Sequence, residues 1–275
     1  MQATIWLRRL QAAAAGGMLG LALAFPQETM AAVRESCRLW AGSVMPALFP
    51  YLALSQWLCA SVHAPALTVP LAMLGGSPAG ARLIALGGFS PARAQRLAAL
   101  CVTASPLFVL GTLRGGARML AAHWLGAVTA WGFARLTETR RAPADSPPAA
   151  PERAPLSHIL RDAAMAMVAV CACMAFFAAL GALLFRLVPL PPAWQALAAS
   201  LLEMAGGCAR IEALGLPERL RASCQAAAVS FGGLSIFLQN ALYLRPAGVR
   251  LPRQLAARVV HALAAFCACW ALYRS

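Results

Sequence analysis

One carboxylate is isolated in a long uncharged part of the sequence. Glu203 is the only charged residue between Arg186 and Arg210. A carboxylate is unfavourable in apolar surroundings, and inside a membrane it usually faces a cavity, a cation, a proton path or a partner group. We therefore interpret Glu203 as a ligand-binding residue. The alternative is that Glu203 lies near the membrane surface, where it is hydrated or paired with Arg210.

Two arginines follow glycine-rich segments at similar places in the sequence. Arg82 and Arg210 could each bind an anionic substrate, since a guanidinium can donate two parallel hydrogen bonds to one anion. They could equally hold lipid phosphates. The glycine-rich segments would expose backbone N–H groups, and a helix that begins there attracts an anion, although small residues also allow helices to pack closely in membranes. The residues concerned are Gly76, Ser77 and Gly80 in the first segment, and Gly206 and Gly207 in the second.

Two further apolar segments are interrupted by residues that break helices. Backbone carbonyls and hydroxyls freed at such breaks could coordinate a substrate or a cation; a simple helix kink is the alternative. Gln239 and Asn240 could instead hydrogen-bond between helices. The first interruption contains Ser105 and Pro106, and the second contains Ser230, Gly232, Gly233 and Ser235.

The remaining reactive residue types show no pattern typical of an enzyme or a metal site. The nine cysteines contain no C-x-x-C pair, and the four histidines lack HExxH spacing. A Walker loop and a GxGxxG motif are also absent. We therefore expect no catalysis, no metal and no cofactor. His123 and His261 fall in apolar segments, where they could relay protons or pack as neutral side chains.

The composition is typical of an integral membrane protein. Of the 275 residues, 61% are hydrophobic and only 12% are charged, and the mean hydropathy is +0.68. Soluble domains carry about 25% charged residues, so a soluble enzyme is excluded. The net charge of +14 comes from 23 arginines spread between apolar stretches, which is typical of segments that flank membrane spans and contact lipid headgroups. We expect membrane lipid as a partner, and no nucleic acid.

Two halves of the sequence share the same order of parts. Residues 1–33 predict an N-terminal transmembrane helix, with a cleaved signal peptide as the alternative. A first repeat follows at 34–136, a Pro-rich linker at 137–156 and a second repeat at 157–275. The repeats match locally, as in ARLIALG at 81–87 and ARIEALG at 209–215. We infer an internal duplication.

Each repeat contains an apolar segment that is too short to cross a membrane. These segments are 67–74 and 194–202, whereas a spanning helix needs about 20 residues. Short segments closed by Gly and Pro predict re-entrant hairpins. Each repeat would add three full crossings, and because three is odd, the second repeat would be inverted. The predicted fold class is all-α: a polytopic membrane protein of two inverted repeats with re-entrant hairpins.

Five short motifs resemble the nucleoside-recognition, or Gate, domain family, in particular its sporulation integral membrane proteins of the YlbJ type. They are MPALFPY at 45–51, GGSPAGAR at 75–82, ASPLF at 104–108, LEM at 202–204 and FGGLS at 231–235. The resemblance implies a fold similar to the core of concentrative nucleoside transporters, with two hairpins that meet near the bilayer centre. It also implies a small polar metabolite, dipicolinate in the sporulating branch, and a multi-pass protein of the bacterial inner membrane.

Together these features predict a transporter or permease for a small polar solute, anionic or nucleoside-like, that works by alternating access. A coupling cation or proton and a homo-oligomer belong to the same prediction. The alternative is a non-transporting membrane component of a sporulation or envelope assembly complex. Solute flux through the purified protein would favour the first, and a stable protein partner without flux would favour the second.

Overall fold

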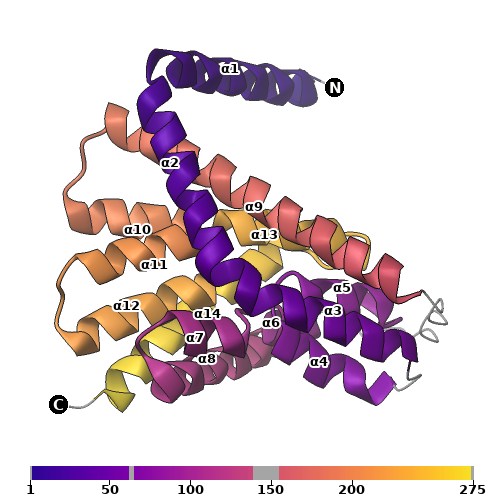
Figure 1. Cartoon of the computed structure of the whole chain (residues 1–275). Helices are drawn as coiled ribbons and strands as arrows, with labels where there is room; N and C mark the ends of the chain where they lie inside the picture. Colours follow the sequence, from indigo (N-terminus) through magenta and orange to yellow (C-terminus); the bar gives the residue numbers. More distant parts are fainter. Residues whose placement is uncertain (1, 62–64, 139–154, 274–275) are drawn as a thin grey trace.

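The computed structural model describes residues 2–61, 65–138 and 155–273. Every regular element in these ranges is a helix (Figure 1), so the all-α prediction is confirmed for this part of the chain. The Pro-rich linker predicted at 137–156 falls largely outside the described residues. In both halves a long helix is followed by two short helices, an interrupted helix and a continuous helix.

The first half begins with a helix that stands apart from the bundle and continues into a long bent helix. The bend has physical causes, because a π-helical turn over Trp40–Val44 interrupts the α-helical ladder and Pro50 lies inside the next helix. The elements are α1 (Gln2–Ala24), α2 (Pro26–Leu39), α3 (Met45–Ser61), α4 (Thr68–Gly75), α5 (Ala79–Leu86), α6 (Pro91–Cys101), α7 (Pro106–Thr112) and α8 (Gly116–Leu136), with a 3₁₀ turn at Pro65–Leu67.

The second half repeats this order without the leading α1. Its elements are α9 (Leu156–Leu187), α10 (Pro192–Leu202), α11 (Met204–Ala213), α12 (Glu218–Phe231), α13 (Gly233–Leu244) and α14 (Leu251–Leu272). The interruption between α12 and α13 follows from Gly232, whose φ of +84° is left-handed and ends a helix readily in glycine. The interruption between α6 and α7 is fixed by Pro106, the first residue of α7.

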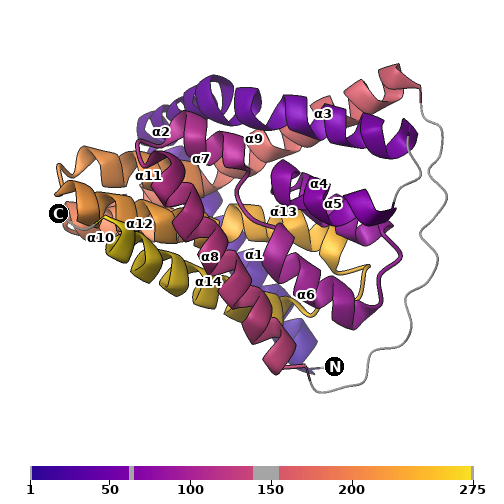
Figure 2. The ribbon, with the colours of Figure 1, turned by 90° about the horizontal axis from the view of Figure 1, so that it is seen from below.

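The bundle is held together by helix pairs that join the two halves. α8 packs along α14, and α2 packs along α9, as Figures 1 and 2 show from two directions. A shared apolar core includes Phe108 from α7, Met174 from α9, Met204 from α11 and Val229 from α12. The two halves therefore form one packed body around a common centre.

The two pairs of short helices approach this centre from opposite ends of the bundle. In Figure 1, α10 and α11 come from the left, and α4 and α5 come from the right. Side-chain contacts mark the outer ends: Arg82 on α5 reaches Asp162 at the start of α9, whereas Glu212 on α11 reaches Arg114, just before α8. The inner ends of the two pairs consequently face the middle of the molecule.

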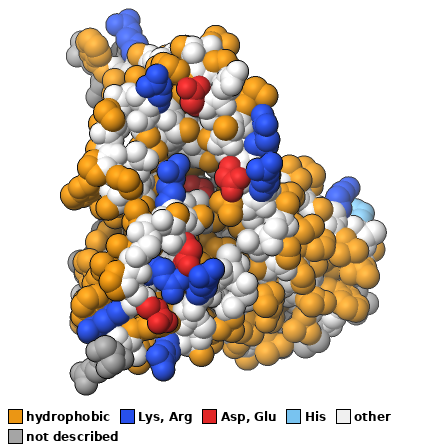
Figure 3. Space-filling model, turned by 60° about the vertical axis from the view of Figure 1, so that its left-hand side comes forward, with side chains coloured by type: hydrophobic (Ala, Val, Ile, Leu, Met, Phe, Trp, Pro, Cys, Tyr) orange, Lys and Arg blue, Asp and Glu red, His pale blue; other side chains and the backbone are white. Residues whose placement is uncertain are grey.

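Four stretches are long and apolar enough to cross a membrane, by length and composition. They are Pro91–Thr112, Leu156–Leu187, Glu218–Leu244 and Leu251–Leu272. The face in Figure 3 fits this class, because wide hydrophobic areas flank a strip where the charged side chains gather. The predicted membrane class is thus supported. α1 is not among the four stretches, so its crossing stays a prediction.

Candidate functional site

A small buried cavity lies at the centre, and all four interruptions of the helices meet near it. We call the turn over residues 76–78, between α4 and α5, the first tip, and Glu203, between α10 and α11, the second tip. The first break is 102–105, between α6 and α7, and the second break is Gly232, between α12 and α13. The inner cavity has a volume of about 30 Å³, and its wall includes Ser77, Ala104, Ser105, Glu203 and Gln239.

The first tip is held against the first break and against α13. The backbone N–H of Ser77 donates to the carbonyl of Thr103 at 2.8 Å, and the amide of Asn240 donates to the Ser77 hydroxyl at 3.0 Å. Gly76 has a φ of +62°, and a Cβ there would lie 2.6 Å from the backbone nitrogen of Ser105. Only glycine fits position 76 of this turn. Asn240 joins distant segments by a hydrogen bond, as expected, but its partner lies in the turn and not in another helix.

The second tip is formed by Glu203, which is 6% exposed. Its carboxylate accepts hydrogen bonds from the backbone N–H groups of Ala205 at 2.8 Å and Gly206 at 2.6 Å, so it caps the start of α11. In the described residues no ion pair joins it to Arg210. The second tip also touches the second break, since a Cβ at Gly233 would lie 3.1 Å from the Leu202 carbonyl oxygen.

The wall of the inner cavity is mostly apolar, with a few polar groups and helix starts beside it. α5, α11 and α13 each begin beside it, and the start of a helix carries partial positive charge. The side-chain amide nitrogen of Gln239, which lines the cavity, is buried and has no hydrogen-bond partner. The hydroxyl of Ser105 accepts from the N–H of Phe108 at 3.2 Å and caps α7. This arrangement suits a ligand that carries acceptor oxygens or negative charge.

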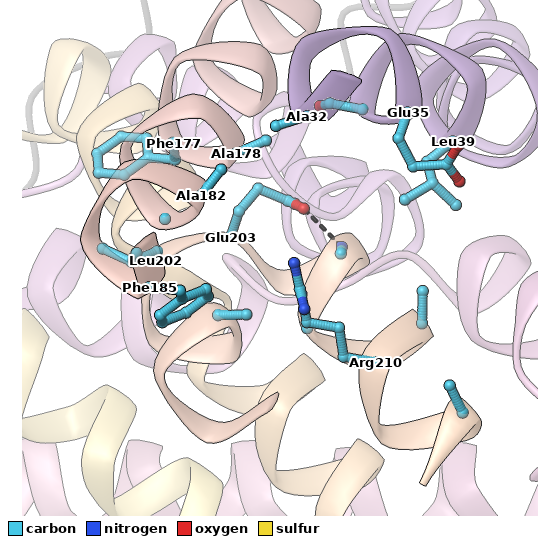
Figure 4. Close-up of a pocket in the computed structure, with 17 residues that line it drawn as sticks. Ala32, Glu35, Leu39, Phe177, Ala178, Ala182, Phe185, Leu202, Glu203 and Arg210 are labelled. Carbon is cyan, nitrogen blue, oxygen red and sulfur yellow. Dashed lines mark hydrogen bonds between the residues drawn. The ribbon is translucent and has the colours of Figure 1, made fainter. Parts of the chain in front are cut away.

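A larger pocket of about 290 Å³ opens beside the inner cavity, between α2, α9, α10 and α11. Figure 4 shows Glu203 and Arg210 in this outer pocket, with Phe185 beside them and Glu35 on α2 opposite. The guanidinium carbon of Arg210 lies 5.5 Å from the centre of the Phe185 ring. Glu203 lines both the outer pocket and the inner cavity and is therefore the residue that separates them.

Several predicted site residues line one of these two spaces. Ser77 and Ser105 line the inner cavity; Gly206, Gly207 and Arg210 line the outer pocket; Glu203 lines both. Gly207 also allows close packing, because a Cβ there would overlap the backbone of Ser200 on α10. Ser77 of the first glycine-rich segment and Glu203, which precedes the second, line the same cavity.

Other predicted residues lie away from both spaces. Arg82 lies in the middle of α5, and its side chain hydrogen-bonds to Gln56 at 3.2 Å and pairs with Asp162 at 3.4 Å. Gly80 serves packing, since a Cβ there would lie 2.6 Å from the Ala72 carbonyl oxygen. The residues that support the tips and breaks without lining either space are Gly76, Ser230, Gly232, Gly233 and Ser235.

The sequence did not single out some residues that line the two spaces. Ala104 and Phe108 line the inner cavity, and Glu35 and Phe185 line the outer pocket. Gln239 was interpreted only as an inter-helix hydrogen-bonding residue. The sequence could not separate the two roles of Gln239, because an amide in an apolar helix can either hydrogen-bond to another helix or line a cavity.

No protein-family model, curated protein or solved structure matches the chain. The similarity to the Gate domain family therefore stays a prediction that rests on the five motifs.

Proposed function

We propose that this protein carries a small polar solute, anionic or nucleoside-like, across the bacterial inner membrane by alternating access. One observation carries the proposal: both tips and the first break line the same buried cavity between the two halves, and the second break packs against the second tip. Interrupted helices that meet in the middle of a membrane protein are typical of transporter binding sites. A purely structural membrane component has no need of such a centre.

The proposal includes the finer architecture predicted from the sequence. The two halves are inverted repeats, and the α4–α5 and α10–α11 pairs are re-entrant hairpins that enter the membrane from opposite sides. Their opposite approach to the centre supports this. Each tip packs against the break of its own half: the first through Gly76 and Ser105, the second through Leu202 and Gly233.

Solute binding requires the two spaces to join. The inner cavity, about 30 Å³ in volume, has room for only a few waters, whereas sites for small molecules usually have about 300–1,000 Å³. The outer pocket, at about 290 Å³, approaches that size. A movement of the α10–α11 pair that displaces Glu203 would connect the pocket to the cavity and admit the solute.

The chemistry of the wall favours acceptor oxygens on the solute. The unpaired amide of Gln239 offers a donor, and Arg210 adds a positive charge in the outer pocket. The N–H groups at the start of α11 are held by Glu203 and become available only if its carboxylate moves away. Glu203 offers the complementary acceptor for an N–H or O–H group. A small carboxylate or a nucleoside satisfies both requirements.

Flux through purified protein tests the proposal. Proteoliposomes are loaded with a defined mixture of nucleosides and small carboxylates, dipicolinate included, and efflux of each is followed by mass spectrometry. We expect flux of at least one solute, and its loss in Glu203→Gln. Glu212→Gln is the matched control, since it makes the same substitution near the other end of α11, away from both spaces; it should retain flux.

A second experiment does not depend on knowing the solute. Ser77→Cys in a cysteine-free background places one thiol on the inner cavity. Alternating access predicts that a membrane-impermeant thiol reagent labels it from either side of the membrane, in right-side-out and inside-out vesicles. Labelling from neither side, together with absence of flux, would instead support a non-transporting component of a membrane complex.

A further inference from the structure

A buried cluster of three basic side chains lies outside the two spaces described above. The rings of His123 on α8 and His261 on α14 are 4.8 Å apart. Both histidines are completely buried, and Arg258 on α14 is 5% exposed. None of the three lines the inner cavity or the outer pocket. Such a group inside a membrane protein requires an explanation, because charged side chains there usually serve function.

His123 connects the cluster to both breaks. Its Nδ1 atom lies 2.8 Å from the hydroxyl of Ser230, which is close to the end of α12. Its ring also lies against the backbone of Ala104, which lines the inner cavity. Arg258 donates to the carbonyl of Ser230 at 3.4 Å. A change in the cavity that displaces either break therefore changes the surroundings of the cluster.

Two ring nitrogens of the cluster, His123 Nε2 and His261 Nδ1, are buried without a hydrogen-bond partner, and the contacts of His261 show which of its own nitrogens carries the lone pair. The Nε2 atom of His261 lies 2.9 Å from the carbonyl of His123, and because a carbonyl only accepts, this nitrogen carries hydrogen. In a neutral ring the lone pair is then on Nδ1, which is buried without a hydrogen-bond partner. A proton needs no additional volume, so it is the ligand that fits a site with no open space.

Arg258 is the charged group that faces the two histidines. Among the described carboxylates, none pairs with it. Of the neighbouring helices, α7 carries no titratable side chain, and the charged residues of α6 and α12 lie toward their outer starts. Cys101, at the end of α6, directs its thiol at the Val69 carbonyl.

The charge of Arg258 beside His261 links proton binding at His261 to anion binding in the inner cavity. A proton on His261 places two positive charges side by side, which is unfavourable in a buried site. No described carboxylate pairs with Arg258, and the carboxylate on the neighbouring cavity, Glu203, already accepts from the N–H groups of Ala205 and Gly206. Negative charge that arrives in the neighbouring cavity offsets the repulsion. Anion and proton therefore favour each other's binding, and this effect is reciprocal.

We infer that His261, together with His123 and Arg258, binds a proton that travels in the same direction as an anionic solute. The inference rests on the proposed transport function and identifies its coupling ion. The proton adds to the lone pair of His261 Nδ1 when the anion is bound. It leaves from the same atom after the anion has been released on the other side.

Two flux assays separate coupling from transport itself. Counterflow of the carboxylates of the mixture, at equal pH on both sides, requires no net proton movement. Uptake of the same carboxylates from an acidic exterior into a neutral interior is driven by the proton gradient. We expect His261→Gln to retain counterflow and to lose the acceleration that the gradient gives to the wild type. His158→Gln, at an exposed histidine at the start of α9, is the matched control and should behave as wild type.

The outcomes are distinguishable. Absence of counterflow in the wild type defeats the proposed function, and this inference with it; counterflow that is indifferent to the gradient defeats the inference alone. Equal loss of both activities in a folded His261→Gln also overturns it. If this variant does not fold, the wild-type protein is tested in weakly buffered nanodiscs with a pH-sensitive dye. We expect the dye to report proton uptake by the protein when the carboxylates are added. Absence of proton uptake refutes the inference.

Discussion

Glu203 combines a structural and a functional task, and these can be separated by two substitutions. Glu203→Ala removes the cap from α11, so we expect a loss of about 1 kcal/mol of stability as well as loss of flux. Glu203→Gln retains an oxygen that can accept from the N–H of Ala205 or Gly206 and should unfold near the wild-type temperature while losing flux. Thermal unfolding in detergent and efflux from proteoliposomes measure the two effects. Normal flux in Glu203→Gln would refute its role in solute binding.

At the outer end of α11, Glu212 makes the stability depend on pH. The hydrogen bonds from Arg221, at 2.7 Å, lower the pKa of this carboxyl below its ordinary value of 4.5. A lowered pKa stabilises the folded protein above the ordinary value, and this contribution is lost as pH falls through the lowered pKa. We expect Glu212→Gln to unfold at a lower temperature at neutral pH, with the difference from wild type shrinking below about pH 4.5. Parallel unfolding curves across this range would contradict the assignment.

Among single residues, isolation in the sequence pointed to a carboxylate that is buried beside both spaces, whereas similarity between the repeats did not place matching residues alike. Glu203 was predicted because no charge lies near it in the chain. Arg82 and Arg210 match in sequence, yet Arg210 lines the outer pocket while Arg82 pairs with Asp162 from the other half. The role of Gln239 depends on α13 lying beside the first tip, a contact between distant segments that local patterns do not encode.

The turn between α4 and α5 depends on one glycine. Alanine at Gly76 would have to adopt a φ of +62° and place its Cβ 2.6 Å from the Ser105 nitrogen. With a ψ of −159°, this backbone conformation is essentially restricted to glycine and costs another residue about 1–3 kcal/mol, so Gly76→Ala should lower stability by at least about 1 kcal/mol. Gly132→Ala on α8 is the control, because its Cβ meets nothing within 4 Å; it should be neutral or stabilising by up to about 1 kcal/mol. Denaturation curves of both variants measure the two changes in stability. Equal changes in Gly76→Ala and Gly132→Ala would contradict the tight turn at Gly76.

At the level of the helices, the sequence predicted their order and their breaks better than it predicted which helices continue into one another. The breaks at Pro106 and Gly232 were predictable because these residues act locally. The course of the long helix is different in kind: α2 continues through a π-helical turn into α3, so the helix runs from Pro26 to Ser61. That continuation is favoured by packing of α2 along α9, which composition alone does not reveal.

For the whole molecule, alternating access predicts that the two halves move against each other. α2 belongs to the first half and α9 to the second, and they form one wall of the outer pocket. Cys37 on α2 and Cys171 on α9 have their sulfur atoms 4.0 Å apart, so a small side-chain rotation brings them within reach of a disulfide. Oxidation by copper phenanthroline, which removes two electrons and releases two protons, would then join the halves at this wall.

We expect this cross-link to stop solute flux and dithiothreitol to restore it, because a covalent bond between α2 and α9 restricts the opening of the outer pocket. Cys37→Ser retains the other cysteines and should stay active under the same oxidation, which separates this bond from damage elsewhere. Mass spectrometry of the peptides verifies that the bond has formed. Undiminished flux through a fully cross-linked protein would mean that α2 and α9 move as one unit, and the motion would have to be sought between the α10–α11 pair and the rest of the bundle.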